Sequence, residues 1–183
     1  MRGDINTNPY CVLFVGTGNS TRSIIAEPIL NSAGRGRFRA FSAGSEPKDE
    51  VHPYALDLLK KLHYDVSGLG PTHWQEFSRP DAPKLDFVFT VCDKAAKETR
   101  PVWPGQPLTA HWSIPDPAET SGNEAEVRFA FAETLRMLRN RIEIFVSLPL
   151  GSLGQLAVQK RLDAWSRTES GAPVKPVQHG RAG

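Results

Sequence analysis

The chain has 183 residues, of which 39% are hydrophobic and 23% charged, and its formal net charge at pH 7 is +2. A chain of this length and composition is typical of one globular domain with a sizeable core. The small net charge, without a dense basic run in the body of the chain, argues against a nucleic-acid partner, and the apolar stretches are too short for a membrane span.

Strands and helices are predicted to alternate from the first apolar run onwards. Residues 10–15 are continuously apolar between Pro9 and Gly16, and such a run predicts a buried parallel strand. The next helix is expected to begin near Ser23, and Pro28 inside it is expected to kink or shorten it. The elements predicted after it are a strand at 37–44, a helix at 52–62, and strands at 85–92 and 107–114.

The clearest helix is predicted for residues 124–148, where apolar residues recur at steps of three or four. We interpret this stripe as core packing. Its members are Val127, Phe131, Leu135, Leu138, Ile142 and Phe145. Pro149 ends the helix, and a short helix over 152–165 is expected to follow.

Strands that alternate with helices predict a single α/β domain. We expect it to span residues 1–165, with a central parallel sheet of about four strands and helices on both faces. The polar, Gly- and Pro-rich residues 166–183 predict a disordered tail. Ligands of such sheets bind at the carboxyl ends of the strands, where the 16–22 loop, Cys92 and the 113–118 loop can meet.

The segment GTGNSTRS, residues 16–23, leaves a predicted strand and enters a predicted helix. Successive N–H groups in such a loop can converge on an anion, and the helix N-terminus adds positive potential. Gly16 and Gly18 permit unusual backbone angles, and Asn19 tolerates a left-handed conformation. Arg22 offers a planar fork for two oxygens of a tetrahedral oxyanion. Further hydroxyl donors are Thr17, Ser20, Thr21 and Ser23. The alternative is a tight turn with a surface arginine.

Two other glycine-rich motifs fit this segment less well. A dinucleotide fingerprint requires glycine or alanine where Thr21 stands, and an acidic residue where the chain has Ser42. The mononucleotide P-loop requires a Gly-Lys-Ser/Thr ending, which the segment lacks. The residues themselves therefore favour an oxyanion over a nucleotide as the ligand.

Several segments together resemble the low-molecular-weight protein tyrosine phosphatase family, and more narrowly the thioredoxin-coupled arsenate reductases built on that fold. The resemblance covers residues 9–160 and rests on VLFVGTGNSTRSIIAE, FSAGSEP, VHPYALDLL, FVFTVCDKAA, PVWPGQPLTAHWSIPDP and the long helix. It implies the family's fold. It also implies a reaction in which a cysteine thiolate attacks phosphorus or arsenic, loop amides and an arginine hold the oxyanion, and an aspartate acts as the general acid.

On this resemblance, Arg22 matches the arginine that holds the oxyanion, and Asp116 matches the general acid. Ser23 matches the hydroxyl beside the thiolate, and Asn19 matches the asparagine that stabilises the loop. Cys92 matches the second cysteine of the reductases, which attacks the arsenylated first cysteine and releases arsenite. The resemblance therefore implies catalytic roles for Arg22, Asp116 and Cys92 and oxyanion binding by the whole loop.

Two departures from the family pattern set this chain apart. Gly16 stands where the family has its nucleophilic cysteine, and no cysteine occurs near residues 99–100 to match the third redox position. The chain is therefore predicted to bind arsenate or phosphate and to be catalytically impaired. The alternative is an active arsenate reductase or phosphatase that uses another group, such as Cys92, with thioredoxin or a related thiol reductant as its partner.

The two cysteines, Cys11 and Cys92, are not expected to form a structural disulfide. Residues 1–10 lack the apolar core of a signal peptide, which predicts a cytoplasmic location, where such disulfides are rare. Cys11 begins a predicted buried strand and is interpreted as a small core hydrophobe. The cysteines and the five histidines show no metal-ligand spacing, so neither a metal nor a cofactor is expected.

Overall fold

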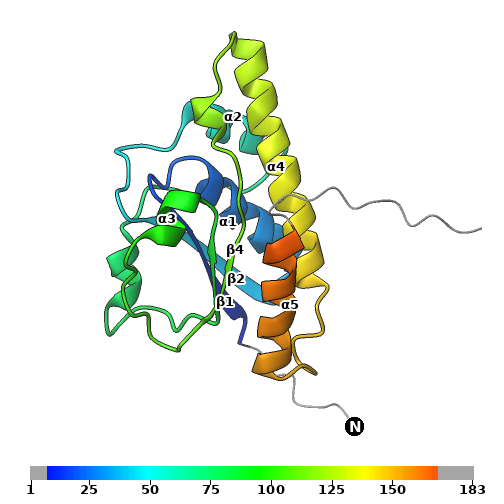
Figure 1. The fold of residues 1–183 in the computed structure, drawn as a ribbon. Coiled ribbons are helices and arrows are strands. Elements are labelled where there is room, and N and C mark those ends of the chain that lie inside the picture. The colour runs from blue at the N-terminus through cyan, green and yellow to red at the C-terminus, as the bar shows by residue number, and fades with distance from the viewer. Residues whose placement is uncertain (1–7, 169–183) are drawn as a thin grey trace, which may run out of the picture.

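A parallel four-stranded sheet in the order β2-β1-β3-β4 organises the chain (Figure 1). The computed structural model describes residues 8–168. The strands are β1 (Tyr10–Gly16), β2 (Phe38–Gly44), β3 (Phe87–Thr90) and β4 (Leu108–His111), and all neighbouring pairs are parallel. The predicted sheet is confirmed, although β3 and β4 are shorter than the predicted 85–92 and 107–114.

Five α-helices and two 3-10 helices are found within residues 8–168. They are α1 (Arg22–Ala33), α2 (Pro53–Lys61), η1 (Trp74–Ser78), α3 (Asp93–Lys97), η2 (Pro117–Glu119), α4 (Glu124–Val146) and α5 (Gln155–Thr168). The sequence pattern did not predict η1, α3 or η2, because elements of three to five residues are too short to show a helical period. Helix α5 extends to Thr168, so residues 166–168 of the predicted tail are helical, and residues 169–183 lie outside the described residues.

Helix α1 continues through Pro28 to Ala33, so the proline does not end the helix. The proline ring is buried with the apolar face of the helix, which includes Ile24, Ile25 and Leu30. This face packs into the core between the sheet and α4. Packing therefore outweighs the loss of one backbone donor inside the helix.

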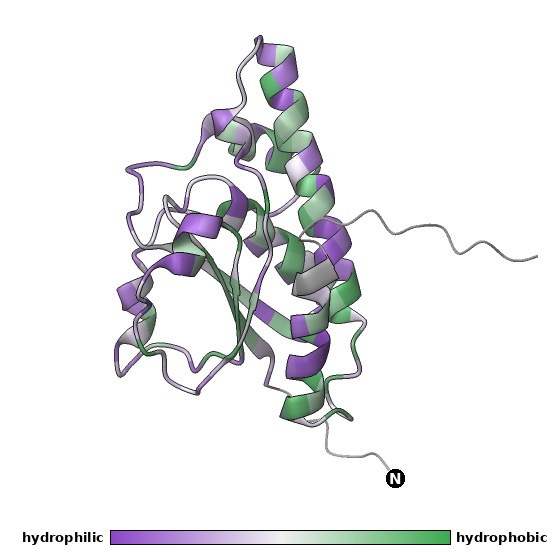
Figure 2. Cartoon of the chain, viewed as in Figure 1, coloured by the Kyte–Doolittle hydropathy of each residue, from purple (hydrophilic) through white to green (hydrophobic). Residues whose placement is uncertain are grey.

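Alternate residues of β1 face two different cores, as the period of a strand requires. Val12 and Phe14 belong to the larger core, with residues from α1, α2, α4 and α5. Leu13 and Val15 belong to the smaller core, with residues from η1 and α3. Helices therefore cover both faces of the sheet, with α1, α2, α4 and α5 on one side and η1 and α3 on the other (Figures 1 and 2).

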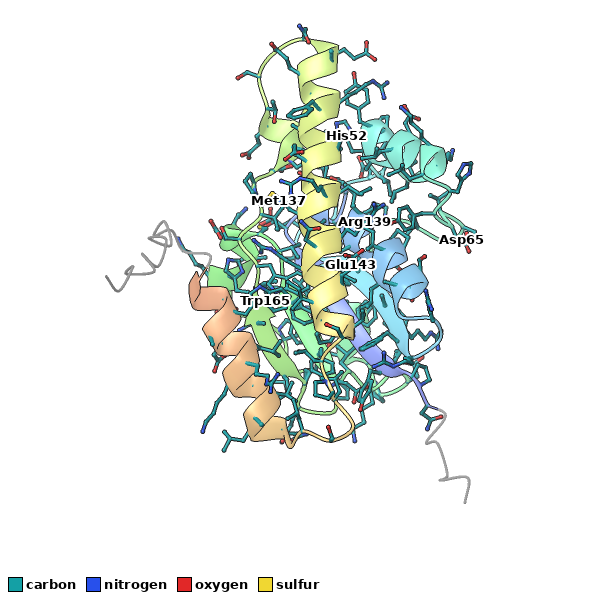
Figure 3. All side chains as sticks on the ribbon, turned by 90° about the vertical axis from the view of Figure 1, so that its right-hand side faces the viewer. His52, Asp65, Met137, Arg139, Glu143 and Trp165 are labelled. Carbon is teal, nitrogen blue, oxygen red and sulfur yellow. The ribbon has the colours of Figure 1, made fainter. Side chains whose placement is uncertain are left out.

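The apolar stripe of α4 forms part of the larger core, as predicted. Five of its six members are buried, and Val127, near the N-terminal end of the helix, is half-buried; the five are Phe131, Leu135, Leu138, Ile142 and Phe145. Removing each such side chain from water contributes roughly 1.5–3 kcal/mol. Figure 3 shows His52 beside α4 and Trp165 on α5. The His52 ring lies 4.7 Å from that of Phe131, and Trp165 packs on Trp112 at 5.3 Å.

The carboxyl ends of the strands bring three distant segments together. Gly16 is the last residue of β1, and Cys92 lies two residues beyond the end of β3. Asp116 lies five residues beyond the end of β4, in the connection to α4. Because all four strands are parallel, these three segments lie at the same edge of the sheet.

Candidate anion-binding site

A cavity of about 450 Å³ opens at this edge of the sheet. It is lined by all the residues that the sequence predicted for the site, which are residues 16–23, Cys92 and Asp116. Four charged residues that the sequence did not single out also line it, namely Glu46, Lys48, Lys94 and Glu119. The cavity has the size of a small-molecule site.

The backbone of the 16–23 loop is oriented by the segment that follows β2. The carbonyl oxygens of Gly16, Thr17, Gly18 and Ser20 accept hydrogen bonds of 2.9–3.3 Å from the N–H groups of residues 45, 46, 48 and 52. Within residues 8–168, by contrast, the N–H groups of residues 17–21 have no protein acceptor. The carbonyls of the loop are therefore occupied, and its N–H groups are free to donate hydrogen bonds to a ligand. Successive N–H groups of this kind form anion-binding concavities.

Gly44 permits the close approach of β2 to this loop. A Cβ atom at position 44 would lie 2.3 Å from the carbonyl oxygen of Thr17 and 3.0 Å from the Cβ of Asn19. Real Cβ atoms essentially never come that close to a backbone oxygen. The missing side chain therefore lets the residues after β2 reach the loop carbonyls.

Asn19 fixes the shape of the loop from inside. Its φ angle is +45°, the left-handed conformation that the sequence predicted for this residue, and the residue is buried. The side-chain oxygen accepts a hydrogen bond from the N–H of Thr72 at 2.8 Å, and the side-chain nitrogen donates to Ser23 Oγ at 2.9 Å. Asn19 thus connects the loop both to the segment before η1 and to the first turn of α1.

Arg22 and Asp116 form an ion pair on one side of the cavity. Arg22 is the first residue of α1, and its Nη2 lies 3.4 Å from Asp116 Oδ2, while Nη1 donates to the carbonyl of Ile114 at 2.8 Å. The Oδ1 atom of Asp116 accepts hydrogen bonds from the N–H of Ala118 at 3.0 Å and from the hydroxyl of Thr21 at 3.3 Å. Both charged side chains are therefore held in the cavity wall by protein groups.

Cys92 presents its sulfur to the same cavity. The residue is buried, and its Sγ lies 3.1 Å from the hydroxyl oxygen of Thr17. Cys92 is also the N-cap of α3, where Sγ accepts a hydrogen bond from the N–H of Ala95 at 3.3 Å. The second cysteine, Cys11, lies near the opposite end of β1, and both thiols are free. Burial and the nearby carboxylate of Asp86 raise the pKa of Cys11 above its ordinary value.

The charged residues that the sequence missed surround the opening of the cavity. Lys94 pairs with Glu46 at 3.6 Å, and both side chains are well exposed. The stem of Lys48 lies close to Gly18, since a Cβ at that position would be 3.3 Å from Lys48 Cγ and Cε. All of these residues stand in loops or in helices of three to five residues, where sequence alone gives them no periodic signal.

A chain of hydrogen bonds supports the segment that carries Cys92. His111, the last residue of β4, places Nδ1 2.7 Å from the hydroxyl of Thr90 and Nε2 2.8 Å from Asp93 Oδ1. Hydrogen bonds from His111 and Ser113 lower the pKa of Asp93. Thr90 and Asp93 flank Cys92, so His111 holds the cysteine segment against β4. No spacing in the sequence indicated this contact.

Residues 8–168 contain no cluster of three or more histidine, cysteine, aspartate or glutamate side chains that could hold a metal ion. None of the helices in this range is both long enough and apolar enough to cross a membrane.

Comparison with known proteins gives a family match over most of the chain. Residues 11–159 match the model of the low molecular weight phosphotyrosine protein phosphatase family. An arsenate reductase of Halalkalibacterium halodurans is 31% identical over 139 residues, which cover 75% of this chain and 96% of that protein. A glutaredoxin arsenate reductase of Synechocystis is 28% identical over 136 residues, covering 74% and 95%. A solved arsenate reductase in a phosphate-binding state matches with a TM-score of 0.61 and 28% identity, covering 75% and 97%.

Proposed function

Because the chain belongs to the low molecular weight phosphotyrosine protein phosphatase family, we propose that it binds a tetrahedral oxyanion, arsenate or phosphate, in the 16–23 loop. The observation that carries this proposal is the row of N–H groups of residues 17–21, without protein acceptors in the described structure, in the same cavity as Arg22. Backbone donors, a helix N-terminus and a guanidinium all favour an anion with several oxygens. The choice of these two anions is supported by the similar arsenate reductases, one of which was solved in a phosphate-binding state.

The ion pair between Arg22 and Asp116 is compatible with anion binding. At 3.4 Å, the contact between Nη2 and Oδ2 is longer than a strong charge-assisted hydrogen bond. An oxyanion in the loop can therefore compete with Asp116 for Nη2, while the bond from Nη1 to the carbonyl of Ile114 keeps the guanidinium in place. Thr21 and the N–H of Ala118 remain as donors to the Asp116 carboxylate.

The bound oxyanion meets no side chain at position 16, and we propose that the protein is catalytically impaired for this reason. Gly16 stands where the family resemblance places the nucleophilic cysteine. The hydroxyls in the cavity need a base to become nucleophiles, and the carboxylate that contacts one of them, that of Asp116, is paired with Arg22. Loss of a covalent nucleophile costs roughly a millionfold in rate in a serine protease. The third redox cysteine of the reductases, which in the family pattern acts after the second, is also missing from the chain.

One observation favours a second function, that of an enzyme whose nucleophile is Cys92. Its Sγ lines the same cavity, beside Thr17 and at the start of α3. In this scheme the Cys92 thiolate attacks arsenic(V) and displaces water or hydroxide, forming a sulfur–arsenic bond. A thiolate of thioredoxin or a related reductant then attacks Cys92 Sγ. The sulfur–arsenic electron pair leaves with arsenic as arsenite, and a mixed disulfide remains.

Calorimetric titration with phosphate and arsenate tests the binding proposal. The parent should bind both anions, and Arg22→Ala should weaken both by tenfold or more, because bonds to charged groups contribute about 1.5–3 kcal/mol each. Arg161→Ala, an exposed arginine on α5, is the matched control and should bind like the parent. Equal affinities for Arg22→Ala and the parent would refute the binding proposal.

Turnover assays decide between the two functions. The parent is expected to show no arsenate reduction with a thioredoxin or glutaredoxin system and no hydrolysis of an aryl phosphate. If the parent turns over and Cys92→Ser does not, the second function replaces the proposal of catalytic impairment. Cys92→Ser should leave anion binding close to that of the parent, since serine preserves the size of the side chain in the cavity wall.

A further inference from the structure

The floor of the cavity contains an open space beside Gly16. A Cβ atom built at this position would lie 3.4 Å from Ser23 Oγ and 3.9 Å from Ser23 Cβ. Apart from Gly16 and its two chain neighbours, no other described atom lies within 4 Å of it. The neighbouring side chains have therefore not moved in to fill the place that a side chain at position 16 would occupy.

The hydroxyl of Ser23 borders this open space. Ser23 is 1% exposed, and together with Gly16 it lines the cavity. Its oxygen accepts a hydrogen bond from the side-chain nitrogen of Asn19, so its own proton is left to donate. Among residues 8–168, this hydroxyl has no acceptor. A buried donor without an acceptor is costly, so an acceptor atom supplied by a ligand is favoured there.

The groups around this space favour one kind of ligand atom. The hydroxyl of Ser23 is the donor that borders this space, and the N–H groups of residues 17–21 belong to the same cavity lining. The carbonyls of Gly16, Thr17 and Gly18 are already bound to the segment after β2. The N-terminus of α1, a helix of 12 residues, adds positive potential at the same place. An oxygen that carries negative charge meets all of these conditions, whereas an apolar atom or a cation meets none.

We propose that one oxygen of the bound oxyanion occupies the space beside Gly16 and accepts a hydrogen bond from Ser23. This inference rests on the proposed binding of a tetrahedral oxyanion. Glycine at position 16 then strengthens binding, because it admits an oxygen to a place that any side chain would fill. A thiolate at the same place would also repel the anion. The ligand class is an inorganic tetrahedral oxyanion that presents an unsubstituted oxygen to the floor of the cavity.

A double-mutant cycle measured by calorimetry with phosphate tests this inference. Gly16→Ala adds one methyl group at ordinary contact distance, so the fold is expected to remain intact. It should weaken phosphate binding about tenfold, and Ser23→Ala should do the same, because each removes the bond to a charged oxygen. The double variant should bind no more weakly than Gly16→Ala, since that bond can be lost only once. Gly151→Ala, which also places its methyl group in open space, should bind like the parent.

The outcomes separate this inference from the function on which it rests. If the parent binds neither phosphate nor arsenate, both are overturned. If the parent binds in an Arg22-dependent way but Gly16→Ala binds equally well, the space holds solvent and only this inference is overturned. Strictly additive losses in the double variant would also overturn it. Circular dichroism verifies the fold of each variant, and if Ser23→Ala does not fold, the comparison of Gly16→Ala with Gly151→Ala decides the question.

Discussion

Replacing Gly16 with cysteine is expected to create phosphatase activity, which we predict the parent to lack. A Cβ at this position makes only ordinary contacts, the nearest being Ser23 Oγ at 3.4 Å, so the new side chain fits without moving the backbone. Its sulfur would enter the cavity among the N–H groups of the 16–23 loop and near the N-terminus of α1. The hydroxyl of Ser23, which lacks an acceptor in the described structure, could donate to the thiolate.

These donors determine how far the pKa of the new thiol should fall. A free cysteine has a pKa of about 8.5, and helix N-termini and neighbouring cations lower it to about 3.5–7.5. A new thiol with a pKa of about 6.5 would be stabilised as the thiolate by about 2.7 kcal/mol. The thiolate fraction at pH 7 would then rise from about 3% to about 76%. The same charge would oppose the incoming anion, so Gly16→Cys should bind phosphate more weakly than the parent.

Hydrolysis of an aryl phosphate measures the new activity, and the pH dependence of alkylation measures the thiol pKa. The activity of Gly16→Cys should fall when Asp116→Asn is added, because asparagine preserves the shape but cannot protonate the leaving group. Arsenate reduction should not return, since the chain has no third redox cysteine. If Gly16→Cys binds phosphate, yet its new thiol titrates near the free value and no hydrolysis occurs, the loop does not stabilise a thiolate at position 16.

Two further predictions concern stability. Gly44→Ala should lower the free energy of unfolding in urea by about 1–3 kcal/mol and weaken phosphate binding, because its Cβ would lie 2.3 Å from the carbonyl oxygen of Thr17; Gly151→Ala should change neither. Burial raises the pKa of Glu27 from 4.5 to about 7, so the folded state holds this proton more tightly than the unfolded state. The contribution of Glu27 to the free energy of unfolding should therefore be largest at acidic pH and fall by about 2 kcal/mol between about pH 5 and about pH 7.5. Glu27→Gln should remove that fall and Glu143→Gln, on the exposed face of α4, should not; equal pH profiles for the two variants would contradict the assignment.

The regular elements could be predicted because their burial leaves a pattern in the sequence. The continuous apolar run of β1 and the stripe of α4 both follow from which faces are removed from water. The predicted strand at 85–92 was too long at both ends, since β3 begins at Phe87 and ends at Thr90. At its far end, Cys92 caps α3 instead of continuing the ladder. A helix of five residues has no period from which to predict that ending.

The candidate site was predictable only where its residues lie in one contiguous motif or match positions of the family that the sequence resembles. Asn19 adopts the left-handed conformation that its residue type favours, and the loop around it joins a strand to a helix as expected. The positions of Glu46 and Lys48 follow from hydrogen bonds between two backbone segments, which no side-chain pattern encodes. The contact of His111 with Asp93 depends on the register of β3 and β4, which the sequence did not specify.

Amide NMR during a phosphate titration tests anion binding by the 16–23 loop, because it observes the proposed donors one by one. The N–H resonances of residues 17–21 and the guanidinium resonances of Arg22 should shift together with one dissociation constant. Amides in α5, which lines none of this cavity, should stay unchanged. Saturable shifts confined to other parts of the chain, or no shifts at any phosphate concentration, would contradict binding by this loop.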